Sequence, residues 1–547
     1  MHGIDWAVLA AYLLGTSWLA ERLSGRGQTI RDFFLGGRRL PWWAVSGSIV
    51  ASEVSGVTFV AIPALSFAPG GNFTYLMLVT GVVLARFVIG YVFVPAFYRR
   101  EIYSPYEFMG QRLGPAAERL ATGLFFLGTF LAQGARLFVA ALVLTHIAPV
   151  GIVGAIVLLG AVSTVWTWIG GIASVVWTDV VQFAVIFAGA LAALAAVVGA
   201  VPGGIPEILR LGSRDGKFVL FDLRTDPAAA YTLWCGLLGM PFLTMASHGT
   251  DQMTAQRIFC CRDAAAARRA VLWSSLSQLL PVLMLTVGVG MYAYFRHFPP
   301  SAAEAALLAE RSENVLPLFI KKAMPVGLRG LLFATVFSAA TATSTLSAMA
   351  QTALASLYLP LRRRPAREAH LVLVSRLLVL VSAAGLCGAA LACDRVRRYP
   401  AVLDLALAMA GYTYGALLGM LLLALRPAGR DARGLAWGVP FSVLLVFALS
   451  WQHQAWARAF LVPAAAVLGG TALWFLRREP ARALGGAAAA ALLLVVTFLG
   501  SGAGRGGEPA PLKLAWPWHF PLGTLGTYVL GWALGRKRLA GRDPASL

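Results

Sequence analysis

The chain has 547 residues, of which 59% are hydrophobic and 13% are charged. This dominance of apolar segments excludes a soluble globular domain and indicates a polytopic membrane protein. The net charge is +21, but the basic residues stand in short clusters between apolar segments, as they do in cytoplasmic loops, which argues against a nucleic-acid partner. The five cysteines have neither zinc-ligand nor useful disulfide spacing.

Apolar runs of membrane-spanning length, separated by charges and by Gly or Pro, follow one another along the chain. They predict an all-α protein with about fifteen transmembrane helices. The expected spans are 5–21, 42–67, 73–97, 118–146, 149–170, 176–200, 229–254, 270–295, 328–358, 370–393, 401–425, 433–450, 458–476, 485–501 and 519–535.

The basic loops predict the orientation of these spans. Placing the N-terminus outside puts almost every arginine cluster on one side, which the positive-inside rule assigns to the cytoplasm. One of these predicted cytoplasmic loops carries Arg257, Arg262, Arg268 and Arg269, and the loop at 395–398 is the single exception. The C-terminus is then cytoplasmic, and the expected location is the inner (plasma) membrane of the cell.

Two of the expected spans contain features that weaken a helix. The span 42–67 carries the ionisable Glu53 between glycines, and an ionisable group at membrane depth indicates a functional site. The span 229–254 contains Gly236, Gly239 and Pro241. Transporters built from inverted repeats place their broken helices at corresponding positions of the two halves.

These two spans are five helices apart and cross in opposite senses, as a five-plus-five inverted repeat requires. The predicted organisation is an accessory first helix with a cytoplasmic linker at 1–41, repeats at 42–200 and 229–425, an external loop at 201–228, and accessory helices at 426–547. A short surface helix is expected within 301–318, in the second long external loop.

A break in a membrane helix frees backbone carbonyls, which suit a monovalent cation such as Na⁺. The carbonyls of Ala51 and Val54 are the candidates here. In the span 328–358, the oxygens of Thr341, Ser344 and Thr345 share one helix face. Hydroxyls without a carboxylate suit a monovalent ion better than Ca²⁺ or Mg²⁺. The alternative is structural: small residues let membrane helices pack closely, and Ser or Thr hydroxyls bond to the preceding turn.

Five motifs in this order resemble the sodium:solute symporter family, over residues 30 to about 425. The family includes proline, sialic acid, sugar and monocarboxylate symporters, and the resemblance implies the LeuT fold. The motifs are Asp32-Phe33-Phe34-Leu35-Gly36-Gly37-Arg38, Ala51-Ser52-Glu53-Val54-Ser55-Gly56, Gly170-Gly171 with Trp177-Thr178-Asp179 and Gln182, Asp251-Gln252 with Gln256-Arg257, and Ser344-Thr345-Leu346-Ser347.

The resemblance implies a sodium site. Its ligands are the carbonyls of Ala51, Val54 and Thr341 and the hydroxyls of Ser344 and Thr345. Some members of the family hold a second cation with an aspartate of helix five and hydroxyls of helix eight, which correspond here to Asp179, Ser344 and Ser347. Ala348 replaces a hydroxyl found in those members, so the number of sodium ions stays open between one and two. For Asp179 a helix-capping role is the alternative.

Two charged residues bear on the solute. Glu53 stands where the proline symporters carry Asp. Arg136 lies in the middle of a span, where a guanidinium must find an anion. It either pairs with Glu53 or binds a carboxylate of the solute through a bidentate contact, as in the sialic acid symporters that this arrangement resembles.

The remaining wall of a solute pocket is expected from helices one, three, six and ten. Aromatic rings beside hydroxyls suit a small polar organic solute, although such residues also serve as packing and interfacial anchors. For His248 a structural hydrogen bond within its helix is the favoured alternative. The residues are Ser55, Thr58, Phe59, Gln133, Phe242, Thr244, His248, Tyr412 and Tyr414.

The sequence therefore predicts a sodium-coupled secondary active symporter that imports a small polar solute by alternating access, with a carboxylate-bearing solute (monocarboxylate, sialic acid or amino acid) preferred. A symporter of a neutral sugar or polyol is one alternative. A membrane-embedded enzyme or a sensor without transport is another, and the scattered histidines argue against the enzyme. The expected partners are Na⁺, the solute and the lipid bilayer, and no motif specifies an oligomeric state.

Overall fold

The computed structural model describes residues 2–23, 30–54, 56–100, 102–147, 150–340, 342–362, 367–395, 402–426, 432–451, 454–474, 479–499 and 513–535. Within these ranges every regular element is helical, apart from an isolated bridge between Leu40 and Cys261. The expectation of an all-α protein is confirmed.

The helices form two compact units, and each unit draws on separated parts of the chain. The first unit is Met1–Val79, Thr129–Asp222 and Gln256–Ala406. The second is Thr80–Gly128, Leu223–Ala255 and Leu407–Leu547. Both units combine segments from the two predicted repeats, so neither unit corresponds to a single repeat.

The first unit holds the helices that carry the predicted ion ligands. They are α1 (Gly3–Leu23), α2 (Ile30–Leu35), α3 (Trp42–Glu53), α4 (Gly56–Phe67), α9 (Ile152–Ala200), α10 (Gly204–Arg214), α13 (Ala264–Trp273), α14 (Leu279–His297), α15 (Ala302–Glu310), α16 (Val315–Ala323), α17 (Leu328–Ala340), α18 (Thr343–Ala353), α19 (Leu359–Leu361) and α20 (Glu368–Arg395).

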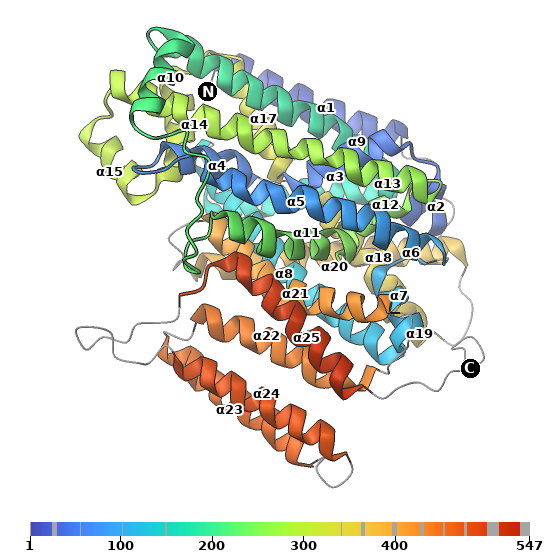
Figure 1. Cartoon of the computed structure of the whole chain (residues 1–547). Helices are drawn as coiled ribbons and strands as arrows, with labels where there is room; N and C mark the ends of the chain where they lie inside the picture. Colours follow the sequence, from blue (N-terminus) through green and yellow to red (C-terminus); the bar gives the residue numbers. More distant parts are fainter. Residues whose placement is uncertain are drawn as a thin grey trace. The chain divides into compact units, whose positions relative to one another are not determined.

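The second unit includes the helices of the C-terminal part, where α23 and α24 lie side by side (Figure 1). Its helices are α6 (Val94–Tyr98), α7 (Pro105–Leu113), α11 (Met240–Gly249), α22 (Leu435–Trp451), α23 (Ala455–Trp474), α24 (Pro480–Leu499) and α25 (His519–Leu534). Four helices contribute residues to both units: α5 (Met77–Val88), α8 (Pro115–Ile147), α12 (Gln252–Phe259) and α21 (Val402–Leu425).

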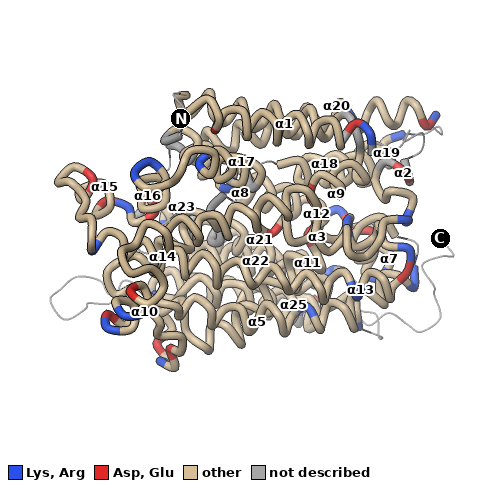
Figure 2. Tube along the Cα trace, turned by 90° about the horizontal axis from the view of Figure 1, so that it is seen from above, with Lys and Arg blue, Asp and Glu red and all other residues tan. Residues whose placement is uncertain are grey.

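Among the described residues, five helical stretches are long and apolar enough to cross a bilayer, and a bent pair formed by Trp42–Glu53 and Thr58–Phe67 makes a sixth. Several other apolar helices are shorter. Charged residues gather toward the helix ends, whereas the middle stretches carry few of them (Figure 2). The five are Thr74–Tyr98, Pro115–Leu142, Gly171–Ala200, Ala264–His297 and Glu368–Cys393.

Helix α9 is interrupted at the boundary expected between two spans. Gly171 has φ 59° and ψ −164°, a backbone conformation that side-chain-bearing residues rarely adopt. The helical stretches before and after it correspond to the expected spans 149–170 and 176–200. The glycine pair of the motif therefore marks the junction between these spans.

Helices α4 and α14 approach each other closely through small residues. A Cβ placed on Gly288 would lie 2.1 Å from the hydroxyl oxygen of Ser66 and 2.2 Å from the carbonyl oxygen of Pro63. The hydroxyl of Ser66 donates to the carbonyl of Leu285 at 2.7 Å. Close backbone approach of this kind is the usual basis of helix packing in membranes.

The short helix expected within 301–318 forms as α15. Ser301 and Glu304 make a capping box at its start. The Nζ atom of Lys322, in α16, lies 2.6 Å from the carboxylate of Glu304. This hydrogen bond is the main reason why the pKa of Glu304 falls from 4.5 to about 2.

Acidification should loosen α15 from α16. The folded pKa of Glu304 lies below its unfolded value, so the stabilisation by the ion pair is complete above about pH 4.5 and is lost as the pH falls toward about 2. Hydrogen exchange of the α15 amides, corrected for the intrinsic pH dependence, should rise across this window. In Glu304→Gln the exchange should be raised already at neutral pH and stay constant; equal pH profiles for the two proteins would contradict the assignment.

Candidate functional site

The span 42–67 breaks after Glu53. Val54 is extended, with φ −74° and ψ 126°, and the chain direction changes by 61° between Trp42–Glu53 and Thr58–Phe67. An extended residue at this point ends the helical hydrogen-bond ladder, which leaves backbone carbonyls at the end of α3 available to other partners. Ala51 and Val54 are both buried. Ser55, between the two helices, lies outside the described residues.

A second break, absent from the sequence prediction, divides the span 328–358. Helix α17 ends at Ala340 and α18 begins at Thr343. The N–H of Ala342 donates to the hydroxyl of Ser163 at 2.9 Å, and the hydroxyl of Thr167 donates to the carbonyl of Thr343 at 3.2 Å. Hydroxyls of α9 thus bond the backbone groups at this break. The predicted carbonyl ligand of Thr341 lies outside the described residues.

Four buried side chains from four helices form a cluster that we call the buried ion cluster: Ser48, Asp179, Arg257 and Ser344. The Nη2 atom of Arg257 lies 2.8 Å from Oδ2 of Asp179. Its Nε atom donates to the hydroxyl of Ser48 at 2.7 Å, and that hydroxyl donates to Asp179 Oδ2 at 2.6 Å. Nη2 also donates to the hydroxyl of Ser344.

This geometry adds the burial of Arg257, which the sequence prediction does not include. The prediction counts it among the arginines of a cytoplasmic loop, but its side chain is 0% exposed. A charge that is excluded from water needs a counter-charge, and Asp179 supplies it. The main interaction of the Asp179 carboxylate is therefore its ion pair with Arg257.

The residue before Arg257 extends the same network. The side-chain amide of Gln256 donates to the carbonyl of Phe34 at 3.1 Å and to the hydroxyl of Ser347 at 3.3 Å. Two neighbouring residues of α12 thus bond the two hydroxyls, on Ser344 and Ser347, that the second predicted cation position includes.

The helices that carry the predicted sodium ligands meet at α9. Both α3 and α18 pack against it, and Arg257 joins Ser48 of α3 to Ser344 of α18. Ser344 and Thr345 are buried at the start of α18. The structure thus places hydroxyl oxygens beside one helix break and the buried residues Ala51 and Val54 at the other.

The predicted solute residues of the first unit differ in burial. Glu53 and Thr58 are partly exposed on either side of the first break. Phe59 is fully buried in the apolar core with Val54, so packing alone accounts for it. Gln133 and Arg136 are partly buried in α8. Within the described part of the chain, Arg136 makes no ion pair with a carboxylate.

In the second unit, several predicted solute residues have structural partners. The Nδ1 atom of His248 donates to the carbonyl of Thr244 at 3.1 Å, which matches the alternative given above for this histidine. Tyr412 accepts a hydrogen bond from the indole of Trp451 at 2.6 Å, and the hydroxyl of Tyr414 donates to Asp251.

These contacts position the side chains without excluding contact with a solute. Asp251 also accepts the N–H of Met253 at 2.8 Å and thereby caps α12. Phe242 is partly exposed in α11, whereas Thr244 and His248 are buried.

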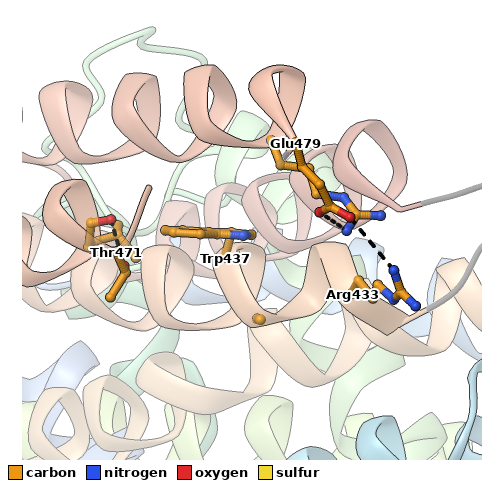
Figure 3. Close-up of a pocket in the computed structure, with 7 residues that line it drawn as sticks. Arg433, Trp437, Thr471 and Glu479 are labelled. Atoms are coloured by element: carbon orange, nitrogen blue, oxygen red, sulfur yellow. Dashed lines mark hydrogen bonds and ion pairs between the residues drawn. The ribbon is translucent and has the colours of Figure 1, made fainter. Parts of the chain in front are cut away.

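A pocket of about 520 Å³ lies among the C-terminal helices of the second unit (Figure 3). Within it, Glu479 pairs with Arg482 and lies 3.7 Å from Arg433. None of the predicted ion or solute residues lines this pocket, so we assign it no role in transport. Its lining residues are Arg433, Ala436, Trp437, Leu468, Thr471, Glu479 and Arg482.

Comparison with known proteins gives relatives that share part of this chain. A human sodium/iodide cotransporter is 29% identical over 384 residues, which are 69% of this chain and 59% of the cotransporter. The bovine sodium-coupled monocarboxylate transporter 2 is 29% identical over 343 residues, which are 61% of this chain and 54% of the transporter. The chain thus spans somewhat more than half the length of these two relatives.

The fold is also found in a solved structure, that of a Na⁺-coupled sialic acid symporter in a substrate-bound outward-open state. The two chains superpose with a TM-score of 0.76 over 97% of each, at 22% identity. The expected LeuT-like, all-α fold is therefore confirmed.

The sequence model of the sodium:solute symporter family matches residues 33–439, well over half of the chain. The match extends over the broken helices, the buried ion cluster and, apart from Asp32, the motifs on which the resemblance rests. It also confirms the expectation of a multi-pass membrane protein. The chain belongs to the sodium:solute symporter family.

Proposed function

We propose that the protein is a sodium-coupled symporter that imports a small anionic organic solute by alternating access. The observation that carries this proposal is the pair of helix breaks, at Val54 and at Ala342, with buried hydroxyls of α18 next to the second. Interrupted helices are the places where transporters bind ions at membrane depth. Membership of the sodium:solute symporter family also supports sodium-coupled transport.

The proposed sodium ligands are the carbonyls of Ala51, Val54 and Thr341 with the hydroxyls of Ser344 and Thr345. We further propose the predicted topology: about fifteen spans, an external N-terminus, a cytoplasmic C-terminus, and repeats at 42–200 and 229–425. The inward movement of one sodium charge across a membrane potential of 100 mV contributes about 2.3 kcal/mol, in addition to the energy of the concentration gradient. Linkage makes the coupling between sodium and solute reciprocal.

The solute is proposed to be an anion that Arg136 binds. A partly buried guanidinium in a spanning helix needs a negative partner, and no described carboxylate pairs with Arg136. The solutes named for the relatives, namely iodide, monocarboxylates and sialic acid, are anions at neutral pH. Bidentate contact with a carboxylate is the geometry that a guanidinium favours.

Transport, and not catalysis, is the proposed activity. The family and the relatives named above are carriers. Within the described residues, His, Cys, Asp and Glu do not gather into groups of three or more that could hold a metal ion. Within the buried ion cluster, Asp179 is paired with Arg257, which suits a carrier scaffold better than an acid–base site.

A proteoliposome uptake screen tests the proposal. Labelled monocarboxylates, sialic acid, iodide, sugars and amino acids are offered with an inward sodium gradient and, separately, with an inward potassium gradient. One class of anion should accumulate only with sodium. Arg136→Ala should then raise the half-saturating solute concentration at least about tenfold, equivalent to about 1.4 kcal/mol of binding free energy.

Two replacements of Arg136, by Lys and by Gln, distinguish the effect of its positive charge from the effect of its bidentate hydrogen-bonding geometry. Arg136→Lys keeps the charge but loses the bidentate fork, so its affinity should fall between those of the wild type and Arg136→Gln. Accumulation of a neutral sugar with unchanged affinity in Arg136→Gln would contradict the anionic solute. Accumulation that does not depend on sodium would contradict the symporter itself.

A further inference from the structure

The guanidinium of Arg257 lies at the centre of the buried ion cluster. Its partners include three oxygens: Asp179 Oδ2 at 2.8 Å from Nη2, the Ser48 hydroxyl at 2.7 Å from Nε, and the Ser344 hydroxyl beside Nη2. The oxygens come from α9, α3 and α18, while the guanidinium comes from α12. The cation in this cluster therefore belongs to the chain itself.

The oxygens of this cluster are those that a monovalent metal ion would use. A carboxylate oxygen and two hydroxyls, all buried, provide a full negative charge and neutral donors of the kind found around Na⁺. A carboxylate buried in this way needs a cation beside it. The positive charge of Arg257 meets that need without an ion from solution.

A sodium ion has no separate place among these oxygens. It would have to share the Asp179 carboxylate with the guanidinium, and two positive charges a few ångströms apart repel strongly where water is excluded. The hydroxyl of Ser347, the third member of the predicted second cation position, already accepts a hydrogen bond from Gln256.

We propose that Arg257 acts as a tethered cation at this position, so that the protein binds one sodium ion per transport cycle and not two. The inference rests on the proposed sodium-coupled function for that one ion. Arg257 then sets the ion stoichiometry, because its own charge and bulk occupy the place of a second ion.

Direct counting of bound ²²Na⁺ on the purified protein tests this inference. The wild type should bind one ion per chain. Arg257→Ala removes the guanidinium and leaves the Asp179 carboxylate with the two hydroxyls, so it should bind two. Thermal unfolding provides a second readout: in choline chloride the Arg257→Ala protein should melt below the wild type, and equimolar NaCl should raise its midpoint more than it raises that of the wild type.

Two matched variants control for indirect effects. The double variant Asp179→Asn/Arg257→Ala lacks both charges, so it should bind one ion and gain no more from NaCl than the wild type does. Arg257→Lys keeps a tethered positive charge and should also bind one ion. If Arg257 had only a structural role and did not replace a cation, Arg257→Ala would lower the melting midpoint by the same amount in choline chloride and in NaCl.

The outcomes separate this inference from the proposed function. Two ions on the wild type, or one ion on a folded Arg257→Ala protein, would overturn the tethered cation while leaving sodium coupling in place. No ion on the wild type, together with uptake that does not depend on sodium, would overturn both. If Arg257→Ala does not fold, the counts on the wild type and on Arg257→Lys still decide, because two ions on either one contradict the inference.

Discussion

Replacing Asp179 with asparagine should lower the folding stability by about 3–5 kcal/mol, the range seen when one partner of a buried ion pair is removed. Asparagine keeps the shape of the side chain and still accepts hydrogen bonds. It does not neutralise Arg257, whose side chain is 0% exposed. Because the missing charge is negative, no concentration of NaCl should restore the stability, in contrast to the Arg257→Ala variant. Thermal unfolding in detergent across a sodium titration measures both effects.

An exposed ion pair in the same unit provides the control. Arg262 and Asp263 lie 2.9 Å apart with side chains that are 73% and 46% exposed. Exposed pairs of this kind contribute roughly 0–1 kcal/mol. Asp263 also caps α13 through the N–H of Ala266, and asparagine caps a helix equally well. Asp263→Asn should therefore change the melting midpoint very little, and an equal loss in both variants would mean that burial does not govern the effect of Asp179.

Replacing Thr345 with alanine should raise the sodium concentration for half-maximal uptake at least about tenfold, equivalent to about 1.4 kcal/mol. The hydroxyl of Thr345 is a proposed sodium ligand and is buried near the start of α18, close to the helix break at Ala342. The double variant Ser344→Ala/Thr345→Ala should lose more, because both hydroxyl ligands are absent. Sodium-dependent uptake into proteoliposomes, at a fixed solute concentration, measures the shift.

Thr352 is a matched control on the same helix. It is buried, and its hydroxyl oxygen has no hydrogen-bond partner among the described residues. Thr352→Ala removes the same atoms from the same helix two turns away, so it should leave the sodium dependence unchanged. If Thr345→Ala and Thr352→Ala have the same sodium curve as the wild type, Thr345 is not a ligand.

The features that the sequence predicts well are those that repeat along the chain or stand out locally. Long apolar runs predict the helices, and the glycine pair at 170–171 predicts the junction within α9. The break after Glu53 is predictable because a carboxylate, hydroxyls and glycines interrupt an otherwise apolar run. Each of these signals lies within a few residues of the feature that it predicts.

The features that the sequence misses depend on partners far away in the chain. An arginine that follows a spanning helix looks like a loop arginine, and only the approach of Asp179, 78 residues away in the sequence, shows that Arg257 is buried. The break at Ala342 lies in a run of Ala, Ser and Thr that is compatible with a continuous helix. Hydroxyls on α9 bond its backbone from 176 and 179 residues away.

The bonds from Ser163 and Thr167 have a consequence for the kinetics of the carrier. They bond the N–H of Ala342 and the carbonyl of Thr343, at the start of α18, by contacts that do not involve an ion. Departure of the proposed sodium ion then leaves the peptide groups at this break oriented as they were, so the empty carrier need not refold this segment before it returns to receive the next ion.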